Sequence, residues 1–186
     1  ARLAYSTVSQ LGYVTIGALL ATSSGVIGGS MHIAMHAFGK ITLFFCAGAI
    51  LIAAHKSKIS EMQGLGRQMP ITMAAFFIAS LSIIGVPPAG GTWSKWFLLM
   101  GTMETAQWTL MVVLMISSLL NIAYLLPIPF RAFFPAAEAP IVNGGIKEAP
   151  LPSLIALCVT ALGCVVLFVY PQPLYELSRA ILATPG

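Results

Sequence analysis

Long apolar runs alternate with short polar segments along this chain. Each run is close to, or longer than, the roughly 20 apolar residues that a helix needs to cross about 30 Å of hydrocarbon. We therefore expect an all-α, polytopic transmembrane helix bundle with about five spans. The runs cover approximately Leu3–Ala21, Gly28–Ala54, Ile71–Met103, Trp108–Phe130 and Leu151–Tyr170.

The third run is too long for one straight crossing, and its middle, residues 85–91, reads Gly-Val-Pro-Pro-Ala-Gly-Gly. Pro87 and Pro88, with three glycines around them, cannot continue a regular helix. In lipid, broken backbone is stable only where protein or a watery cavity satisfies its polar groups. The run is therefore either one broken span or two short elements that meet inside the bundle.

The charged residues favour one broken span. With a single crossing, Arg2, the loop from His55 to Arg67 and the loop from Arg131 to Lys147 all fall on one side of the membrane. An excess of Lys and Arg marks the cytoplasmic side. The other side then receives only Glu104, Glu176 and Arg179.

The tail, residues 171–186, is too short and too polar to cross. Leu174, Leu177 and Ile181 share one face of a helix there, so we expect an interfacial tail.

Composition agrees with a membrane protein. Apolar residues make up 58% of the 186 positions, charged residues 8%, and the mean hydropathy is +0.93. A water-facing domain carries roughly 25% charged residues, so soluble and disordered classes are excluded. The net charge of +4 is scattered over loops, whereas nucleic-acid binding needs a clustered basic face. The expected surroundings are a lipid bilayer, with no nucleic acid.

Three titratable residues, His32, His36 and Lys40, are spaced i, i+4, i+8 in the second run. On a helix this spacing puts them on one face, about 6 Å apart in rise per step. Such groups inside an apolar span are costly unless they face the bundle interior or water. A proton relay is one interpretation, since imidazole accepts and passes a proton near neutral pH. The alternative is that His32 lies near the interface and Lys40 snorkels towards it.

Two other uses of these histidines have weaker support. A metal site at His32 and His36 lacks a third ligand nearby in sequence. A haem would need a second histidine on another span, and His55 is in a loop.

A passive membrane scaffold leaves the lysines without a reason to be buried.

Lys95 follows the Pro-Pro break by seven residues, as expected of an ion site beside a broken helix. The alternative is an interfacial cation anchored by Trp93 and Trp96. Glu104 lies at the predicted outer end of the same run, where it is either solvated or at the exit of a pathway.

Two polar stripes accompany the titratable groups. One comprises Ser6, Ser9, Gln10 and Tyr13 in the first run; the other comprises Ser117, Asn121 and Tyr124 in the fourth. Such stripes either hold water that connects titratable groups or form hydrogen bonds between helices.

Several segments in fixed order resemble the antiporter-like proton-translocating subunits of complex I, Mrp-type sodium/proton antiporters and membrane-bound hydrogenases. Segment 2–13 resembles a signature of this family, segment 32–40 its histidine–lysine helix, and segment 85–96 its second broken helix and lysine. Segments 121–134 and 148–150 most resemble the D-type subunits of the Mrp antiporters. Thr92-Trp93 departs from the phenylalanine that often follows glycine in the family.

The resemblance implies that Lys40 and Lys95 belong to a hydrophilic axis that carries protons, with His32 and His36 connected to it. It implies a bundle of about fourteen helices made of two inverted repeats. We therefore expect residues 1–186 to be the C-terminal part of the proton-conducting domain of a longer chain. The glutamate–lysine pair of the family's N-terminal repeat has no counterpart here.

The expected function is proton translocation, with exchange for sodium as an option, within a multisubunit complex of a bacterial or archaeal inner membrane. Other membrane subunits are the expected partners. We expect no cofactor and no chemistry of the subunit's own. The alternative is the same type of subunit in a redox-driven complex, either complex I or a membrane-bound hydrogenase.

Overall fold

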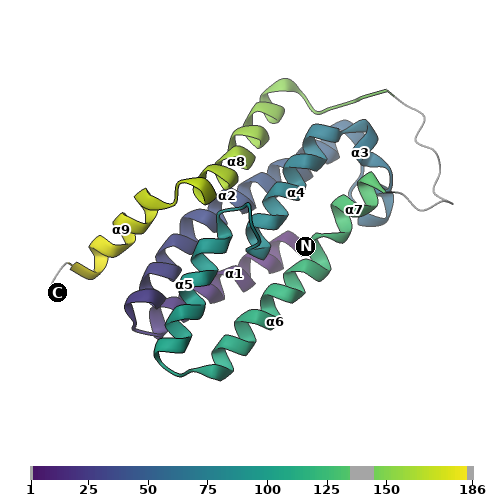
Figure 1. Cartoon of the computed structure of the whole chain (residues 1–186). Coiled ribbons are helices and arrows are strands. Elements are labelled where there is room, and N and C mark those ends of the chain that lie inside the picture. The colour runs from purple at the N-terminus through teal and green to yellow at the C-terminus, as the bar shows by residue number, and fades with distance from the viewer. Residues whose placement is uncertain (1, 135–144, 184–186) are drawn as a thin grey trace.

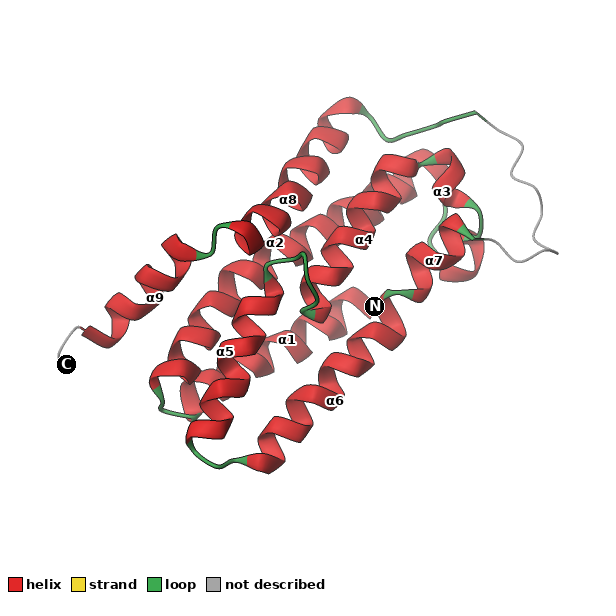
Figure 2. Cartoon of the chain, in the orientation of Figure 1, coloured by secondary structure: helices red, strands yellow, loops and turns green. Residues whose placement is uncertain are grey.

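The computed structural model describes residues 2–134 and 145–183, and all regular structure in these ranges is helical (Figure 2). The all-α prediction is therefore confirmed. The elements in chain order are α1 (Arg2–Leu19), α2 (Ser23–Ala54), the 3-10 turn η1 (Ile59–Met62), α3 (Leu65–Gln68), α4 (Pro70–Ile84), α5 (Gly91–Glu104), α6 (Trp108–Leu125), α7 (Pro127–Phe133), α8 (Leu151–Val169) and α9 (Gln172–Ala183).

Three stretches in the described residues are long and apolar enough to cross a membrane, namely Ser23–Ala54, Trp108–Phe133 and Leu151–Val169. Two further predicted spans also form helices. The first run becomes α1, whose inward face is polar, and the third becomes the short helices α4 and α5. The chain is thus a multi-pass membrane bundle, as predicted.

Helix α2 is the axis of the bundle, because α1, α4, α5, α8 and α9 all pack against it (Figure 1). Its 32 residues make it about 48 Å long at 1.5 Å per residue. It begins at Ser23, five residues before the predicted start at Gly28. The reason is an N-cap, since the Thr22 side chain accepts a hydrogen bond from the Gly25 amide at 3.0 Å.

The third run is one broken crossing, as the charged residues indicated. Helix α4 begins with Pro70 at its first position, where no amide hydrogen is needed, and ends at Gly85, whose φ is +86°. After a cis Pro87–Pro88 bond, α5 starts at Gly91. Helix α4 packs along the C-terminal half of α2, and α5 packs along its N-terminal half (Figure 1).

Glycine allows the closest of these contacts. A Cβ atom on Gly28 of α2 would lie 2.7 Å from the backbone nitrogen of Leu98 on α5. On the other half of α2, a Cβ on Gly39 would lie 2.9 Å from the Ile83 side chain of α4. The two halves of the broken span are therefore held tightly against one continuous helix, which fixes the position of the break.

The charged loops gather at the two ends of the bundle. Figure 1 shows α3, α7 and the start of α8 at one end, and the connection from α5 to α6 at the other. One part of the prediction is wrong, because Arg131 lies in helix α7 and not in a loop. Pro127 starts this additional helix at its first position. Residues 135–144, in the middle of the predicted basic loop, lie outside the described residues.

The tail forms helix α9. Leu174 and Tyr175 pack against apolar residues of α2, whereas Leu177 and Ile181 are exposed. The exposed pair gives α9 an apolar outer face, and the interfacial position of the tail stays a prediction. The last three residues lie outside the described part of the chain.

The half of the bundle around the C-terminal part of α2 has a mainly apolar core. Its core is made of buried apolar side chains from α2, α4, α7 and α8, including Leu43, Met73, Ile83 and Leu157. Most of the polar side chains described below gather at the other half and around the break, and Lys40 lies near the middle of α2.

Candidate functional site

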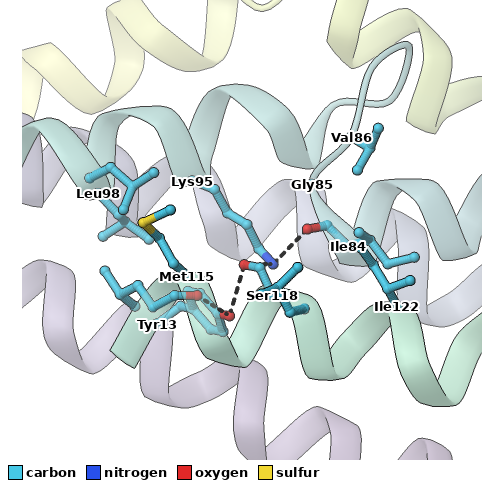
Figure 3. Close-up of a pocket in the computed structure, with 12 residues that line it drawn as sticks. Tyr13, Ile84, Gly85, Val86, Lys95, Leu98, Met115, Ser118 and Ile122 are labelled. Carbon is cyan, nitrogen blue, oxygen red and sulfur yellow. Dashed lines mark hydrogen bonds between the residues drawn. The ribbon is translucent and has the colours of Figure 1, made fainter. Parts of the chain in front are cut away.

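Lys95 lies at the break between α4 and α5, and 7% of its surface is exposed. Its Nζ donates to the Ile84 carbonyl at 2.9 Å and to Ser118 Oγ on α6 at 3.0 Å (Figure 3). The same nitrogen lies 4.6 Å from the centroid of the Tyr13 ring. An interfacial anchor would keep its ammonium group in the headgroup region, whereas this one is turned into the bundle.

The break itself supplies the oxygen that Lys95 binds. In an uninterrupted helix the Ile84 carbonyl would accept from the amide of residue 88, but Pro88 has no amide hydrogen. The Gly85 amide bonds back to Leu81, so α4 ends with the Ile84 carbonyl free to take another donor. The lysine ammonium is that donor.

Lys95 lines a pocket of about 280 Å³ (Figure 3). Its polar lining comes from Tyr13, Lys95 and Ser118, and the rest is mostly apolar side chains such as Leu98 and Met115. The ammonium group therefore sits among neutral oxygens and an aromatic face at the edge of an apolar space.

His32, on α2, is the second titratable group of the site and is 1% exposed. Its Nδ1 lies 2.9 Å from Ser94 Oγ of α5, and its Nε2 lies 3.1 Å from Gln10 Oε1 of α1. The imidazole stacks on the Tyr13 ring at 5.3 Å between centroids, and the Tyr13 ring also contacts Lys95. Tyr13 thus lies between the two groups.

A chain of hydrogen bonds continues from Gln10 across α1 and α6. Gln10 Nε2 donates to Asn121 Oδ1 at 3.3 Å, and the Tyr124 hydroxyl donates to the same oxygen at 2.5 Å. Tyr124 in turn bonds to Ser6. Ser6 and Gln10 of the first polar stripe therefore face Asn121 and Tyr124 of the second across the α1–α6 interface.

Lys40 is at the far end of the titratable row and is 5% exposed. Its Nζ donates to the Leu3 carbonyl, in the first turn of α1, at 3.2 Å. His36 lies between His32 and Lys40, with its ring stacked on His32 at 6.0 Å, and its buried Nε2 has no hydrogen-bond partner among the described residues. The order is Lys95, Tyr13, His32, His36, Lys40.

Two residues in the predicted set lie away from this row. Ser9 is exposed on the outer side of α1, because a residue one position from Gln10 points about 100° away on a helix. Glu104 is exposed at the end of α5, where it accepts a hydrogen bond from Ser24 in the first turn of α2. Its place at a helix N-terminus is favourable for a carboxylate.

Two contributors were absent from the predicted site and its polar stripes: Ser94 and Ser118. Ser118 could have been found from periodicity, since it shares the inward face of α6 with Leu114, Asn121 and Leu125. Ser94 directly precedes Lys95, and only the packing of α5 on α2 shows that it reaches His32.

Known proteins are similar to this chain in sequence and in fold. Residues 1–121 match the family described as NADH:quinone oxidoreductase/Mrp antiporter, TM. Subunit N of NADH-quinone oxidoreductase from Desulforudis audaxviator is 34% identical over 180 residues, which is 91% of this chain and 36% of that protein. The chain thus spans about a third of the length of this curated relative.

Two solved structures show the same fold. The Mrp complex from Dietzia sp. contains a chain that matches with a TM-score of 0.84 at 22% identity, covering 95% of this chain and 41% of that one. A chain of the membrane-bound sulfane sulfur reductase, an archaeal respiratory membrane complex, matches with a TM-score of 0.83 at 25% identity, covering 95% of this chain and 35% of that one.

Proposed function

Because the chain belongs to the family of transmembrane proteins described as NADH:quinone oxidoreductase/Mrp antiporter, we propose that it forms part of a proton-translocating subunit. The subunit would work within a multisubunit complex of a bacterial or archaeal inner membrane. Residues 1–186 would supply the C-terminal part of its proton-conducting domain, and residues 171–186 its interfacial tail.

The observation that carries this proposal is the position of Lys95. A buried ammonium group is costly in a membrane, and here it is held by a carbonyl freed by the Pro-Pro break and by one serine hydroxyl. Both partners are neutral and bind the group without fixing its charge. Lysine can therefore release and regain a proton at this place.

The histidines extend the row towards the second lysine. Neutral imidazole has one donor and one acceptor nitrogen, so it can take a proton on one side and give one on the other. His32 and His36 lie between the lysines in that order. Waters in the polar interior would complete the steps between the stacked rings.

The direct test replaces Lys40 by methionine in the assembled complex, reconstituted in proteoliposomes. Lys40→Met keeps the length and apolar stem of the side chain and removes its proton. We expect proton flux to fall by roughly 100-fold or more, as for loss of a proton-transfer group, with assembly unchanged on a native gel. Lys58→Met, at an exposed loop lysine, is the matched control. Normal flux in well-assembled Lys40→Met complexes would refute the proposal.

The kind of complex is a second question with two candidates, Mrp-type sodium/proton antiport and a redox-driven pump. The subunit N relative favours the redox-driven candidate. The two differ in what drives proton movement in the purified complex. A redox-driven pump moves protons when an electron donor and acceptor are supplied, whereas an antiporter responds to an imposed sodium gradient.

A further inference from the structure

The side-chain amides of Gln10 and Asn121 bond to each other in the middle of the bundle, where they are 0% and 1% exposed. Gln10 directs its oxygen to His32 and its nitrogen to the Asn121 oxygen, which also accepts from Tyr124. Asn121 Nδ2 has no hydrogen-bond partner among the described residues. The pair therefore uses only part of its bonding capacity.

A primary amide keeps its shape after a half-turn about its last torsion, because the oxygen and the NH₂ group exchange places. If both amides turn together, Asn121 Nδ2 donates to the Gln10 oxygen and to the Tyr124 hydroxyl. Tyr124 then donates to Ser6 instead of accepting from it. The number of hydrogen bonds is the same, and the unpaired atom becomes the Asn121 oxygen. The pair thus has two complete arrangements.

Each arrangement requires a different tautomer of neutral His32. When Gln10 presents its oxygen, His32 must carry its hydrogen on Nε2, and Nδ1 accepts from the Ser94 hydroxyl. When Gln10 presents its NH₂ group, Nε2 must accept, so the hydrogen is on Nδ1 and donates to Ser94. Ser94 is then free to donate to the Gly91 carbonyl, which lies 3.1 Å from its oxygen.

We propose that the Gln10–Asn121 amide pair is a tautomer switch for His32. In one arrangement His32 offers α5 a lone pair, ready to accept a proton through Ser94. In the other it offers a hydrogen, ready to donate. This inference rests on the proposed proton transport, and it makes Gln10 and Asn121 positioning residues that act through His32.

A protonated His32 fits only one arrangement. Both of its nitrogens donate, so Gln10 must present oxygen and Ser94 must donate to Gly91. The titratable groups that face His32 are Tyr13 and His36, with Lys95 against the far side of Tyr13 and Lys40 beyond His36. Arrival of a proton at Nδ1 would therefore lock the amides, and its departure would release them.

The direct readout is the tautomer of His32 in the assembled complex, measured by nitrogen NMR on ¹⁵N-histidine-labelled protein. The His32 signals are assigned by their loss in His32→Asn. In the wild type we expect both neutral tautomers, with populations within about tenfold of each other. A single tautomer in the wild type at every pH at which the ring is neutral would overturn the switch.

Two substitutions at Gln10 distinguish an amide that switches the His32 tautomer from one that only holds His32 in place. Gln10→Glu keeps the size and, as a carboxylate, can only accept, so it should keep a hydrogen on His32 Nε2, in the neutral Nε2–H form or in the protonated ring. Gln10→Met removes the hydrogen bond and should change the tautomer ratio by about fivefold, the equivalent of one hydrogen bond. If the turn of the amide matters, Gln10→Glu lowers proton flux at least tenfold although its hydrogen bond to His32 is kept.

Ser80→Ala is the control for loss of a buried polar group, since Ser80 is fully buried and bonds to the Phe76 carbonyl of its own helix. It should leave the His32 tautomers and flux unchanged. Normal flux in Gln10→Glu beside lost flux in Lys40→Met would overturn the switch and leave the proposed function standing. Normal flux in Lys40→Met would remove the proposed function, whatever the tautomers show.

Discussion

The surroundings of Lys95 and Lys40 differ although both lysines are buried in the same bundle. Lys95 binds a carbonyl at a helix break, a hydroxyl of α6 and an aromatic face. Lys40 lies on an unbroken helix and bonds to the Leu3 carbonyl at the longer distance of 3.2 Å. That carbonyl also accepts from the Thr7 hydroxyl.

The difference follows from where free backbone oxygens are found in a membrane. An unbroken helix uses its interior carbonyls for its own hydrogen bonds, so α2 has none to offer Lys40. A break in the chain releases carbonyls at depth, next to Lys95. We infer that the ammonium group of Lys95 is fixed by partners on several elements. Lys40 has one partner, the Leu3 carbonyl, so its position depends on where α1 lies.

The largest effect is expected at Lys95. Replacing it by arginine tests whether this position needs a group that can release its proton or only a positive charge. Lys95→Arg keeps a cation, but guanidinium does not release its proton in proteins. We expect Lys95→Arg to lower proton flux by roughly 100-fold or more, nearly as much as Lys95→Ala. Transport in proteoliposomes, with assembly checked on a native gel, gives the answer. Near-normal flux in Lys95→Arg would make Lys95 a charged anchor outside the pathway.

The next effect tests the break that supplies the oxygen. Gly85 has a φ of +86°, and a Cβ there would lie 2.5 Å from Lys95 Cδ. Gly85→Ala should cost about 1–2 kcal/mol from the left-handed backbone alone and displace Lys95, lowering both the unfolding temperature and flux. Gly48→Ala is the control, because nothing lies within 4 Å of that Cβ. Equal behaviour of the two variants would contradict a special role for the break.

A smaller effect is expected at the second partner of Lys95. Ser118→Ala removes the hydrogen bond from Lys95 Nζ and the 3.3 Å hydrogen bond with the Tyr13 hydroxyl, and it leaves the Ile84 carbonyl in place. Loss of the bond to Lys95, about 1 kcal/mol, corresponds to roughly fivefold slower transport. Its neighbour Ser117, half-buried on the same helix, gives the control variant Ser117→Ala. If Ser118→Ala were as damaging as Lys95→Ala, the hydroxyl and not the carbonyl would be the main partner.

The smallest effect on function is expected for two single-cysteine substitutions. Labelling them shows which lysine lies nearer the cytoplasm. Ser57 and Arg179 are exposed near opposite ends of the bundle, so Ser57→Cys and Arg179→Cys should both be active. Ser178 is 4% exposed and unsuitable. On intact cells, an impermeant thiol reagent should label only the cysteine at position 179. Labelling at position 57 alone would show the opposite orientation. Labelling at both positions would show that the two ends do not lie on opposite sides of the membrane.

Much of the fold could be predicted because membrane helices follow local rules. Apolar length indicated the spans, and Pro87 and Pro88 marked the break. The boundaries at Ser23 and Pro127 were missed, since a cap and a new proline-started helix depend on single residues at the edge of a run. The titratable row on α2 was readable from its spacing, because side chains four apart share a face.

Reading along the chain shows that Pro88 leaves the Ile84 carbonyl without its helical donor and that a lysine follows seven residues later. It does not show that this lysine binds that carbonyl, that Ser118 and not Ser117 joins it, or that Gln10 and Ser94 meet on the two nitrogens of His32, which are contacts between helices. The two kinds of contact differ in their separation along the chain. Backbone bonding is settled within four residues, whereas contacts between helices depend on their rotation and depth, which close approaches such as Gly28 against Leu98 fix for the whole bundle.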